Sequence, residues 1–342
     1  MRDERLDKAR IILIWLVVFG HMIEIFLNAH PVFDGAYLYI YSFHMPAFVM
    51  LAGMTSPATL SKKAVDSLWS KLIYPLLVFS VLYEGFHFAL TGGFSNYISE
   101  SAPYWILWFL LSLIFWRVSL PFLVKFRFPL LLSLVTALTA GIFEPADRTF
   151  SLSRSLYFLP FFVLGHSLYS GRLSISFDEV MARINLVTAI VFMLLLAAIL
   201  YLASPYVSVR MLYGSNPYSS FNYSVEYMIA LRAALLALSM LAAFAFIRIA
   251  SSLPKMPFIH PQNTLWVYLW HGFAFVTLAH YFKANIAAHQ INAPLAFLIV
   301  AASAPLSWLI CVALSRPVIA QGSDALITKL SAKTNKAKKA KP

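Results

Sequence analysis

Residues 10–27 read RIILIWLVVFGHMIEIFL, an apolar segment that carries three ionisable side chains, Arg10, His21 and Glu24. At about 100° per residue on a helix, His21 lies about 20° and Glu24 about −40° from Arg10, so all three share one face. At a rise of about 1.5 Å per residue, His21 lies roughly 16 Å from Arg10, near the middle of a hydrocarbon core about 30 Å thick. Ionisable groups at that depth face a protein interior or a wet cavity, which predicts a functional site. A structural polar pair that holds helices together is the alternative.

The composition is that of a helical membrane protein. Of 342 residues, 61% are hydrophobic and only 12% are charged, and apolar runs recur along the whole chain. We therefore predict an all-α integral membrane protein, with a polytopic membrane domain over residues 1–316 and about ten transmembrane helices. The predicted spans cover about residues 11–28, 37–56, 72–91, 104–124, 128–144, 153–170, 184–204, 224–250, 263–282 and 293–314.

The basic residues predict the topology. The formal net charge is +12, and the positive residues cluster in short loops and tails on the side of the N-terminus. The other side collects Arg148, Arg154, Arg210 and Lys283, while Arg232 falls within a span. This asymmetry predicts that both termini are cytoplasmic, in a multi-pass protein of the cell inner (cytoplasmic) membrane. The basic residues are explained by their role in orienting the protein in the membrane. We therefore do not expect the positive net charge to serve nucleic-acid binding.

Two polar segments lie outside the predicted spans. Residues 317–342 form a basic tail that we expect to be disordered near anionic headgroups. The loop from Pro205 to Tyr223 is rich in tyrosine and asparagine, which suits a sugar ligand and is equally common at membrane interfaces. The lone cysteine, Cys311, excludes an intramolecular disulfide and a Cys-based zinc cluster.

Further polar residues fall inside the spans and predict a polar chamber. Glu84 and His87 at i, i+3 repeat the spacing of His21 and Glu24, but di-iron bundles need two further carboxylates, so we predict no metal site. Each residue alone is as compatible with holding helices together as with lining a site. The residues expected to line the acceptor side or the cavity are His44, Glu84, Trp108, Glu226, Arg232 and His271.

The chain resembles the membrane-bound acyltransferase type 3 family, and within it the fucose O-acetylase-like branch. The specific part of the resemblance is the spacing from Arg10 to His21, followed by Ser42-Phe43-His44-Met45-Pro46. Weaker matches are Leu51-Ala52-Gly53, Lys71-Leu72-Ile73-Tyr74-Pro75, Trp108-Phe109-Leu110, Phe161-Phe162-Val163-Leu164-Gly165-His166 and Tyr268-Leu269-Trp270-His271.

This resemblance implies an enzyme of about ten helices that moves an acyl group, usually acetyl from acetyl-coenzyme A, onto a carbohydrate hydroxyl. It implies His21 as the catalytic histidine and Arg10 as its essential companion. Relatives often carry arginines in the first inner loop, where this chain has Lys62, Lys63 and Lys71. Lysine acts there as a point charge and not as a bidentate phosphate clamp.

The chemistry of the residues agrees with that expectation. A neutral imidazole at His21 can take the proton from a sugar hydroxyl that attacks a thioester, and Glu24 can stabilise the imidazolium. Arg10, Lys62, Lys63 and Lys71 are expected to bind the phosphates of acetyl-coenzyme A as co-substrate. From the outer half, His44 and Arg232 would line the acceptor side or stabilise the oxyanion. Transfer through an acetyl group on His21 is an alternative order.

Other classes of protein remain as alternatives. A polytopic transporter or flippase for a glycan or a small anionic solute also fits buried charges in about ten helices, and it predicts inverted repeats and paired broken helices that the sequence does not display. A membrane scaffold or sensor would tolerate loss of the charges at mid-bilayer. The predicted function is therefore an O-acetyltransferase that acts on a surface glycan.

Overall fold

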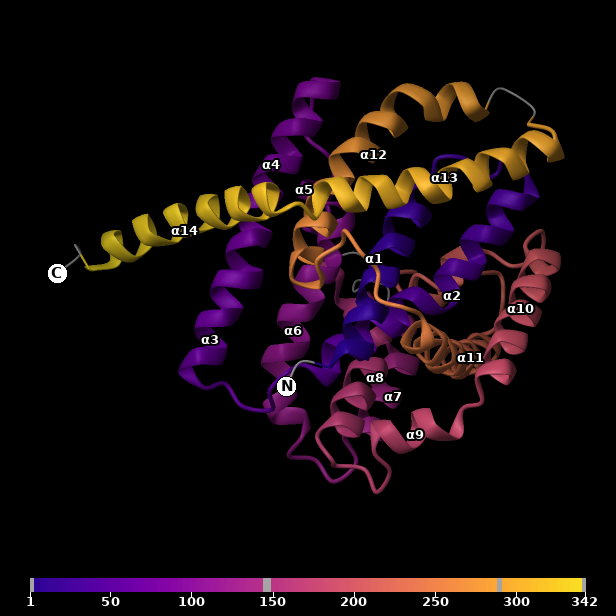
Figure 1. Ribbon diagram of the computed structural model, residues 1–342, viewed down its shortest axis with the longest axis horizontal. Helices are drawn as coiled ribbons and strands as arrows, with labels where there is room; N and C mark the ends of the chain where they lie inside the picture. Colours follow the sequence, from indigo (N-terminus) through magenta and orange to yellow (C-terminus); the bar gives the residue numbers. More distant parts are fainter. Residues whose placement is uncertain (1–2, 144–148, 288–290, 340–342) are drawn as a thin grey trace.

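The computed structural model describes residues 3–143, 149–287 and 291–339, and the regular elements of this part are all helical (Figure 1). Helices α1 (Glu4–Glu24) and α2 (Pro31–Met54) lie at the centre of the bundle. Helix α1 packs against α2, α11 (Val225–Ser252), α12 (Thr264–Ala287) and α13 (Ala293–Leu314). Helix α2 packs against α8 (Leu152–Tyr169), α10 (Leu186–Ala203) and α11. The helix that carries Arg10, His21 and Glu24 is therefore surrounded by protein.

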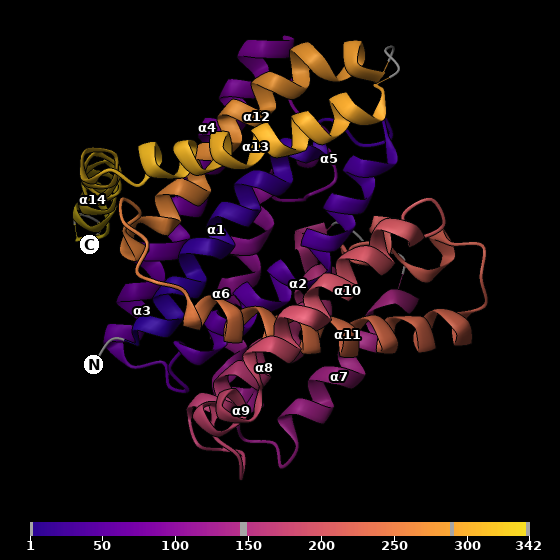
Figure 2. The same ribbon diagram turned by 45° about the vertical axis from the view of Figure 1, so that its right-hand side comes forward.

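Helices occupy all the predicted spans, so the all-α fold is confirmed. Their bounds move by a few residues, and α1 ends at Glu24 instead of continuing to about residue 28, because Asn28 turns the chain with φ 67°. Helices α10 and α11 pack against each other, and α10 crosses in front of α11 in Figure 2. The remaining elements are α3 (Lys62–Leu68), α4 (Tyr74–Thr91), α5 (Asn96–Ser99), α6 (Trp108–Leu123), α7 (Pro129–Thr139), α9 (Phe177–Arg183) and α14 (Pro317–Lys339).

Within the described residues, five helical segments are individually long and apolar enough to cross a membrane: Lys62–Thr91, Trp105–Leu123, Leu186–Ala203, Val225–Ser252 and Ala293–Leu314. The protein is polytopic. The first of these segments joins α3 to α4 through a π-helical turn, Trp69–Ile73. Such turns insert an extra residue into a helix and re-aim the side chains beside them, and Lys71 lies in this one.

Two glycines allow α2 and α8 to pack backbone against backbone. A β-carbon on Gly53 would overlap the carbonyl oxygen of Phe162, and one on Gly165 would overlap the carbonyl oxygen of Met50. Small residues permit this close approach between membrane helices. Nδ1 of His166 also lies 3.1 Å from the carbonyl oxygen of Ser56. Two sequence motifs far apart in the chain therefore form one interface.

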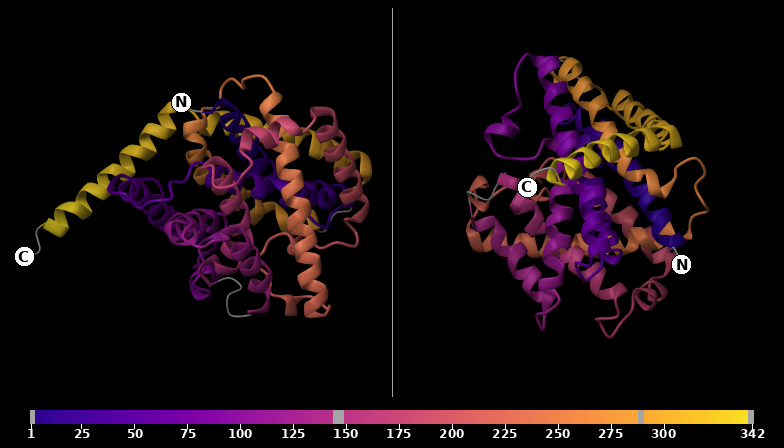
Figure 3. Two further views of the ribbon diagram at one scale, coloured as in Figure 1. Left: turned by 90° about the horizontal axis from the view of Figure 1, so that it is seen from below. Right: turned by 90° about the vertical axis from the view of Figure 1, so that its left-hand side faces the viewer.

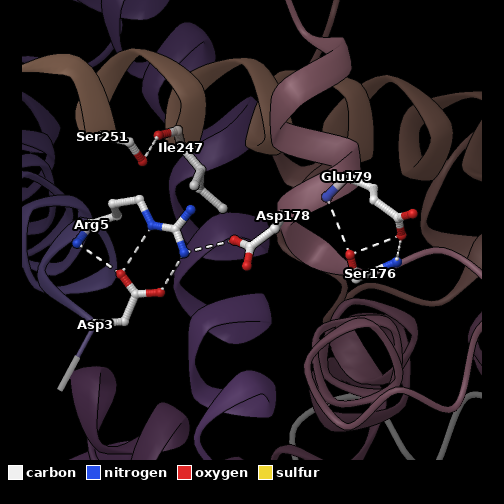
Figure 4. A network of polar contacts seen from close by, with 7 residues as sticks. All are labelled: Asp3, Arg5, Ser176, Asp178, Glu179, Ile247 and Ser251. Atoms are coloured by element: carbon white, nitrogen blue, oxygen red, sulfur yellow. Dashed lines mark hydrogen bonds and ion pairs between the residues drawn. The ribbon is translucent and has the colours of Figure 1, made fainter. Parts of the chain in front are cut away.

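Ion pairs join the N-terminus to two other segments on one face of the molecule, which we call the basic face. Arg5 bonds Asp3 at 2.9 Å and Asp178 of α9 at 2.7 Å (Figure 4). Lys255, just after α11, lies 3.0 Å from Glu4. Partial burial raises the pKa of the Asp3 carboxyl, but hydrogen bonds and charge from Arg5 outweigh it and hold that pKa below its usual value.

In the tail that was expected to be disordered, the described residues contain helix α14, which covers Pro317–Lys339. The helix leaves the bundle after α13 and extends outward (Figures 1 and 3). Its first half is amphipathic: Ala320 and Ile327 are buried, and Ser323 accepts a hydrogen bond from Trp270 Nε1 at 3.0 Å. Ala320 and Ile327 lie on one face of the helix, and this face packs against the bundle. The lysine-rich composition of the segment hides this short apolar pattern in the sequence.

Candidate active site

The centre of the site is the pair His21 and Glu24 in the last turn of α1. Nδ1 of His21 lies 2.7 Å from Oε2 of Glu24, and their side chains are 13% and 29% exposed. A carboxylate on Nδ1 orients the imidazole and leaves Nε2 for proton transfer. Trp105 contacts the imidazole edge-on with ring centroids 4.5 Å apart, and His271 stacks on it at 5.5 Å. The imidazole is thus held on three sides.

Three cavities share His21 in their walls. One opens toward the basic face, has a volume of about 450 Å³ and contains Arg10; we call it the basic-face cavity. The second, of about 420 Å³, lies beneath the loop of residues 204–224 and is called the opposite-face cavity. The third, of about 370 Å³, lies between α4 and α12. These volumes fall in the range of small-molecule sites. His21 is therefore accessible from more than one direction.

Three cationic side chains line the basic-face cavity: Arg10, Lys71 and Arg117. Arg10 Nη2 donates to Thr55 Oγ1 at 3.2 Å, and Arg10 Nη1 lies 3.4 Å from Asp7 Oδ1. Nε of Arg117 is buried with no hydrogen-bond partner among the described residues. Lys62 and Lys63 are exposed on α3 and do not line this cavity. The cavity therefore offers clustered positive charge to an anionic ligand.

Aromatic side chains form much of the wall of the opposite-face cavity. Tyr37 and Tyr41 stack at 4.0 Å, and Tyr213 meets Tyr41 edge-on at 5.5 Å. The Tyr213 hydroxyl donates to the Tyr37 hydroxyl at 3.1 Å. Rings with hydroxyl groups combine apolar stacking surfaces with hydrogen-bonding ends, the combination that a sugar ring requires. Arg154 and Arg210 also line this cavity.

The first and second cavities share a short stretch of wall. The common residues are His21, Tyr41, Met45, Ile106 and Trp108. Met45 precedes Pro46, which interrupts the hydrogen bonding inside α2. The boundary between the two cavities is therefore formed by α1, α2 and the start of α6, with the imidazole in it.

Some residues expected to line the site lie beside His21. Trp108 is in the wall of both cavities, and His44 lines the basic-face cavity, not the acceptor side that its position in the sequence suggested. His44 is buried, with Nδ1 2.8 Å from the carbonyl oxygen of Ile40. His271 is buried behind His21, and its Nε2 has no hydrogen-bond partner among the described residues.

Other expected residues lie outside the three cavities. Glu84 accepts hydrogen bonds from the backbone N–H and the hydroxyl of Ser95, which closes the turn after α4. Glu226 is exposed in the first turn of α11 and lines none of the three cavities. Arg232 donates to the carbonyl oxygens of Ala137 and Asn216, so it ties the loop to the bundle outside these cavities. Depth along a helix predicted these residues, but helix rotation decides which way they point.

Arg117, Arg154 and Arg210 were not predicted as site residues. Arg154 and Arg210 contributed only to the predicted topology. For Arg154 and Arg210 a signal existed, because arginines on the side opposite the cytoplasm run against the topology rule and need another explanation. Arg148, on the same side, and the side chain of Lys283 lie outside the described residues.

The partly buried histidine–carboxylate pair, reached by cavities inside a bundle of apolar helices, fits a membrane enzyme of the group-transfer class. The sequence matches the family model described as "Acyltransferase domain" over residues 3–312. The chain thus belongs to the acyltransferase 3 family and has several helices long and apolar enough to cross a membrane.

Comparison with individual proteins gives a narrower match. The chain is 32% identical over 126 residues to the nodulation protein NolL of Sinorhizobium fredii (strain NBRC 101917 / NGR234), a match covering 32% of this chain and 34% of NolL. The chain spans about a third of the length of that curated relative. No solved structure matches the chain.

Proposed function

We propose that the protein transfers an acetyl group from acetyl-coenzyme A to a hydroxyl of a carbohydrate or surface glycan, with His21 as general base. The observation that carries the proposal is the position of His21 in the walls of both the basic-face and the opposite-face cavities. Two substrates can approach one imidazole from these two directions. Family membership favours this enzyme over the transporter alternative.

The basic-face cavity is proposed to bind the donor. Coenzyme A carries phosphates, and Arg10, Lys71 and Arg117 gather positive charge along the cavity wall. The same wall becomes apolar toward His21 through Phe48, Leu110 and Leu113, which suits the less polar arm of the molecule. The thioester would then reach the imidazole from the basic face, which the positive-inside rule assigns to the cytoplasm.

The opposite-face cavity is proposed to bind the acceptor. Its tyrosine and tryptophan rings can stack on a sugar ring, while Tyr, Ser and Asn side chains supply hydrogen bonds. The similarity to a nodulation protein leaves the acceptor open. The reasons for a carbohydrate are the aromatic wall and the polar groups that converge on His21.

The proposed reaction is a direct acyl transfer. Nε2 of His21 takes the proton of the acceptor hydroxyl as its oxygen attacks the thioester carbonyl, and Glu24 stabilises the imidazolium through Nδ1. When the C–S bond breaks, the thiolate of coenzyme A takes the proton from His21. The products are the O-acetyl sugar and free coenzyme A.

The test is acetyl transfer in membranes that contain the full chain. In the first measurement, labelled acetyl-coenzyme A is supplied to these membranes and the label transferred to glycan is counted. In the second, surface glycans from cells with and without the gene are compared by mass spectrometry for an acetyl-sized difference. Normal acetylation by both His21→Ala and Glu24→Gln proteins would refute the site assignment. Acetylated His21, trapped without acceptor, would instead support transfer through an acetyl-imidazole.

A further inference from the structure

We infer that the opposite-face cavity selects an anionic acceptor, a sugar that carries a carboxylate or phosphate bound by Arg154 and Arg210. This inference rests on the proposed function, which assigns the acceptor to that cavity. It adds a charge requirement to the carbohydrate class.

Arg154 lies in the first turn of α8 with most of its donors uncommitted. Its guanidinium lies over Trp108 and Tyr213, with its central carbon 5.2 Å and 5.8 Å from the ring centroids. Its hydrogen bond within the described residues runs from Nη2 to Ser215 Oγ, at a long 3.4 Å. A guanidinium has five N–H donors. The aromatic contacts thus hold the group while leaving its donors for a ligand in the cavity.

Arg210 is fixed in the adjoining loop. Nη2 donates to Asn216 Oδ1 at 3.1 Å, and Asn216 Nδ2 donates back to the Arg210 carbonyl oxygen at 3.2 Å. The central carbon of this guanidinium lies 5.6 Å from the ring centroid of Phe221. Asn216 is buried, so the loop backbone and the side chain are held together. The second arginine is thereby presented at the cavity wall on a formed loop.

The charge of the cavity is not balanced by protein. Glu24 is the carboxylate among the described lining residues, and it is bound to His21. Within the described part of the chain, no carboxylate lies within ion-pair distance of Arg154 or Arg210. Positive charge in a partly enclosed cavity attracts anions and gains most from a bound counter-charge. A neutral sugar bound in the cavity would supply no counter-charge to Arg154 and Arg210.

Arg232 provides the contrast. Both of its terminal nitrogens donate to backbone carbonyl oxygens, at 3.2 Å to Ala137 and 3.3 Å to Asn216, and its guanidinium lies over Tyr218 at 4.5 Å. The terminal nitrogens of Arg232 are therefore hydrogen-bonded to the protein backbone. The two arginines of the cavity use one side-chain hydrogen bond each instead.

A buried hydrogen bond attaches the loop that carries Arg210 to the start of α8, next to Arg154. Ser153 Oγ donates to the carbonyl oxygen of Gly214 at 2.7 Å in a buried position. Gly214 has φ 66°, and a β-carbon there would overlap the ring of Tyr157, so only glycine fits. This attachment fixes the loop on α8, and preorganised charges bind anions without an ordering cost.

The experiment uses the full-length protein in nanodiscs and measures equilibrium binding of glucose, glucuronate and glucose 6-phosphate. We expect at least one acidic sugar to bind about tenfold more tightly than glucose, the value of one charge-assisted hydrogen bond. Arg154→Gln and Arg210→Gln should each lower the ratio of acidic-sugar affinity to glucose affinity toward one. Arg127→Gln, an exposed arginine outside the three cavities, is the control. Arg154→Lys keeps the charge and should retain part of the preference if Arg154→Gln fails to fold.

The outcomes separate the two proposals. Equal binding of all three sugars, or an acid preference that survives both glutamine variants, would overturn the inference. Acetyl transfer to the same sugars is measured in parallel. Transfer to glucose as efficient as to glucuronate and glucose 6-phosphate refutes the anion requirement and leaves the proposed function standing. Arginine-dependent binding, together with surface glycans that are not acetylated in the membrane assay, refutes the proposed function and keeps the anion site. The acid that binds identifies carboxylate or phosphate as the recognised group.

Discussion

Nδ1 of His21 lies 2.7 Å from Oε2 of Glu24, one helical turn away on α1. The carboxylate therefore holds the imidazole in one orientation. Because the pair forms within a single helix, it does not depend on how that helix packs. The packing of the other helices decides what can reach it.

Replacing His21 should remove the proposed base. For His21→Ala we expect kcat to fall by about 10²–10⁴-fold, the usual contribution of a general base. Glu24→Gln should cost less, because it weakens the orientation of the imidazole and leaves the base in place. Transfer of labelled acetyl in membranes measures both. His260→Ala, an exposed histidine, is the control and should retain full activity.

The donor assignment predicts a split among the cationic residues. Lys71→Gln and Arg117→Gln should raise KM for acetyl-coenzyme A about tenfold, because each removes a cation from the cavity wall. Lys62→Gln and Lys63→Gln, which change exposed side chains outside that cavity, should have little effect. Kinetics with S-acetylpantetheine, which lacks the nucleotide phosphates, provide the comparison. An equal loss with that donor would contradict a phosphate-binding role.

The interface between α2 and α8 predicts an intolerant glycine. In Gly165→Ala the new methyl group would overlap the carbonyl oxygen of Met50, and the helices must separate, at a cost of about 1–3 kcal/mol. Thermal unfolding in detergent should show a clear loss of stability. Gly85→Ala on α4, where no atom lies within 4 Å of the added carbon, is the matched control. It should be neutral or slightly stabilising.

The basic face predicts a pH-dependent contribution from Asp3. Because its pKa is lower in the folded protein than in the unfolded chain, Asp3 stabilises the fold above its unfolded pKa. That stabilisation is lost as the pH falls through the folded value. Asp3→Asn should therefore unfold at a lower temperature than the parent near neutral pH, and the difference should shrink as the pH falls below the ordinary pKa of an aspartate and through the lower folded value. A difference independent of pH would assign the effect to helix capping alone.

The position of α14 predicts protection of the tail. Ile327 is buried, so Ile327→Asn should release the helix from α4 and α12 and increase cleavage by trypsin at Lys329. Val318→Asn, at a side chain that is 80% exposed, should leave the cleavage rate unchanged. Rapid cleavage of the parent protein would show that the helix does not stay docked.

The sequence by itself determined the membrane class, the positions of the helices and the pairing of His21 with Glu24. These features are local: hydrophobic length follows from composition, and residues three apart on a helix are neighbours whatever surrounds them. The face shared by Arg10 and His21 follows from the same periodicity. The α-helices outside the predicted spans are the short α3, α5 and α9 and the tail helix α14, where lysines masked a short apolar stripe.

Only the tertiary structure decided which polar residues meet in a cavity. Glu226 and Arg232 lie on the same helix, yet one is exposed and the other is bound to backbone carbonyls. Arg154 and Arg210 come together because Ser153 and Gly214 attach a distant loop to α8. Helix rotation and loop folding depend on contacts between segments far apart in the chain. Spacing along one segment carries no information about them.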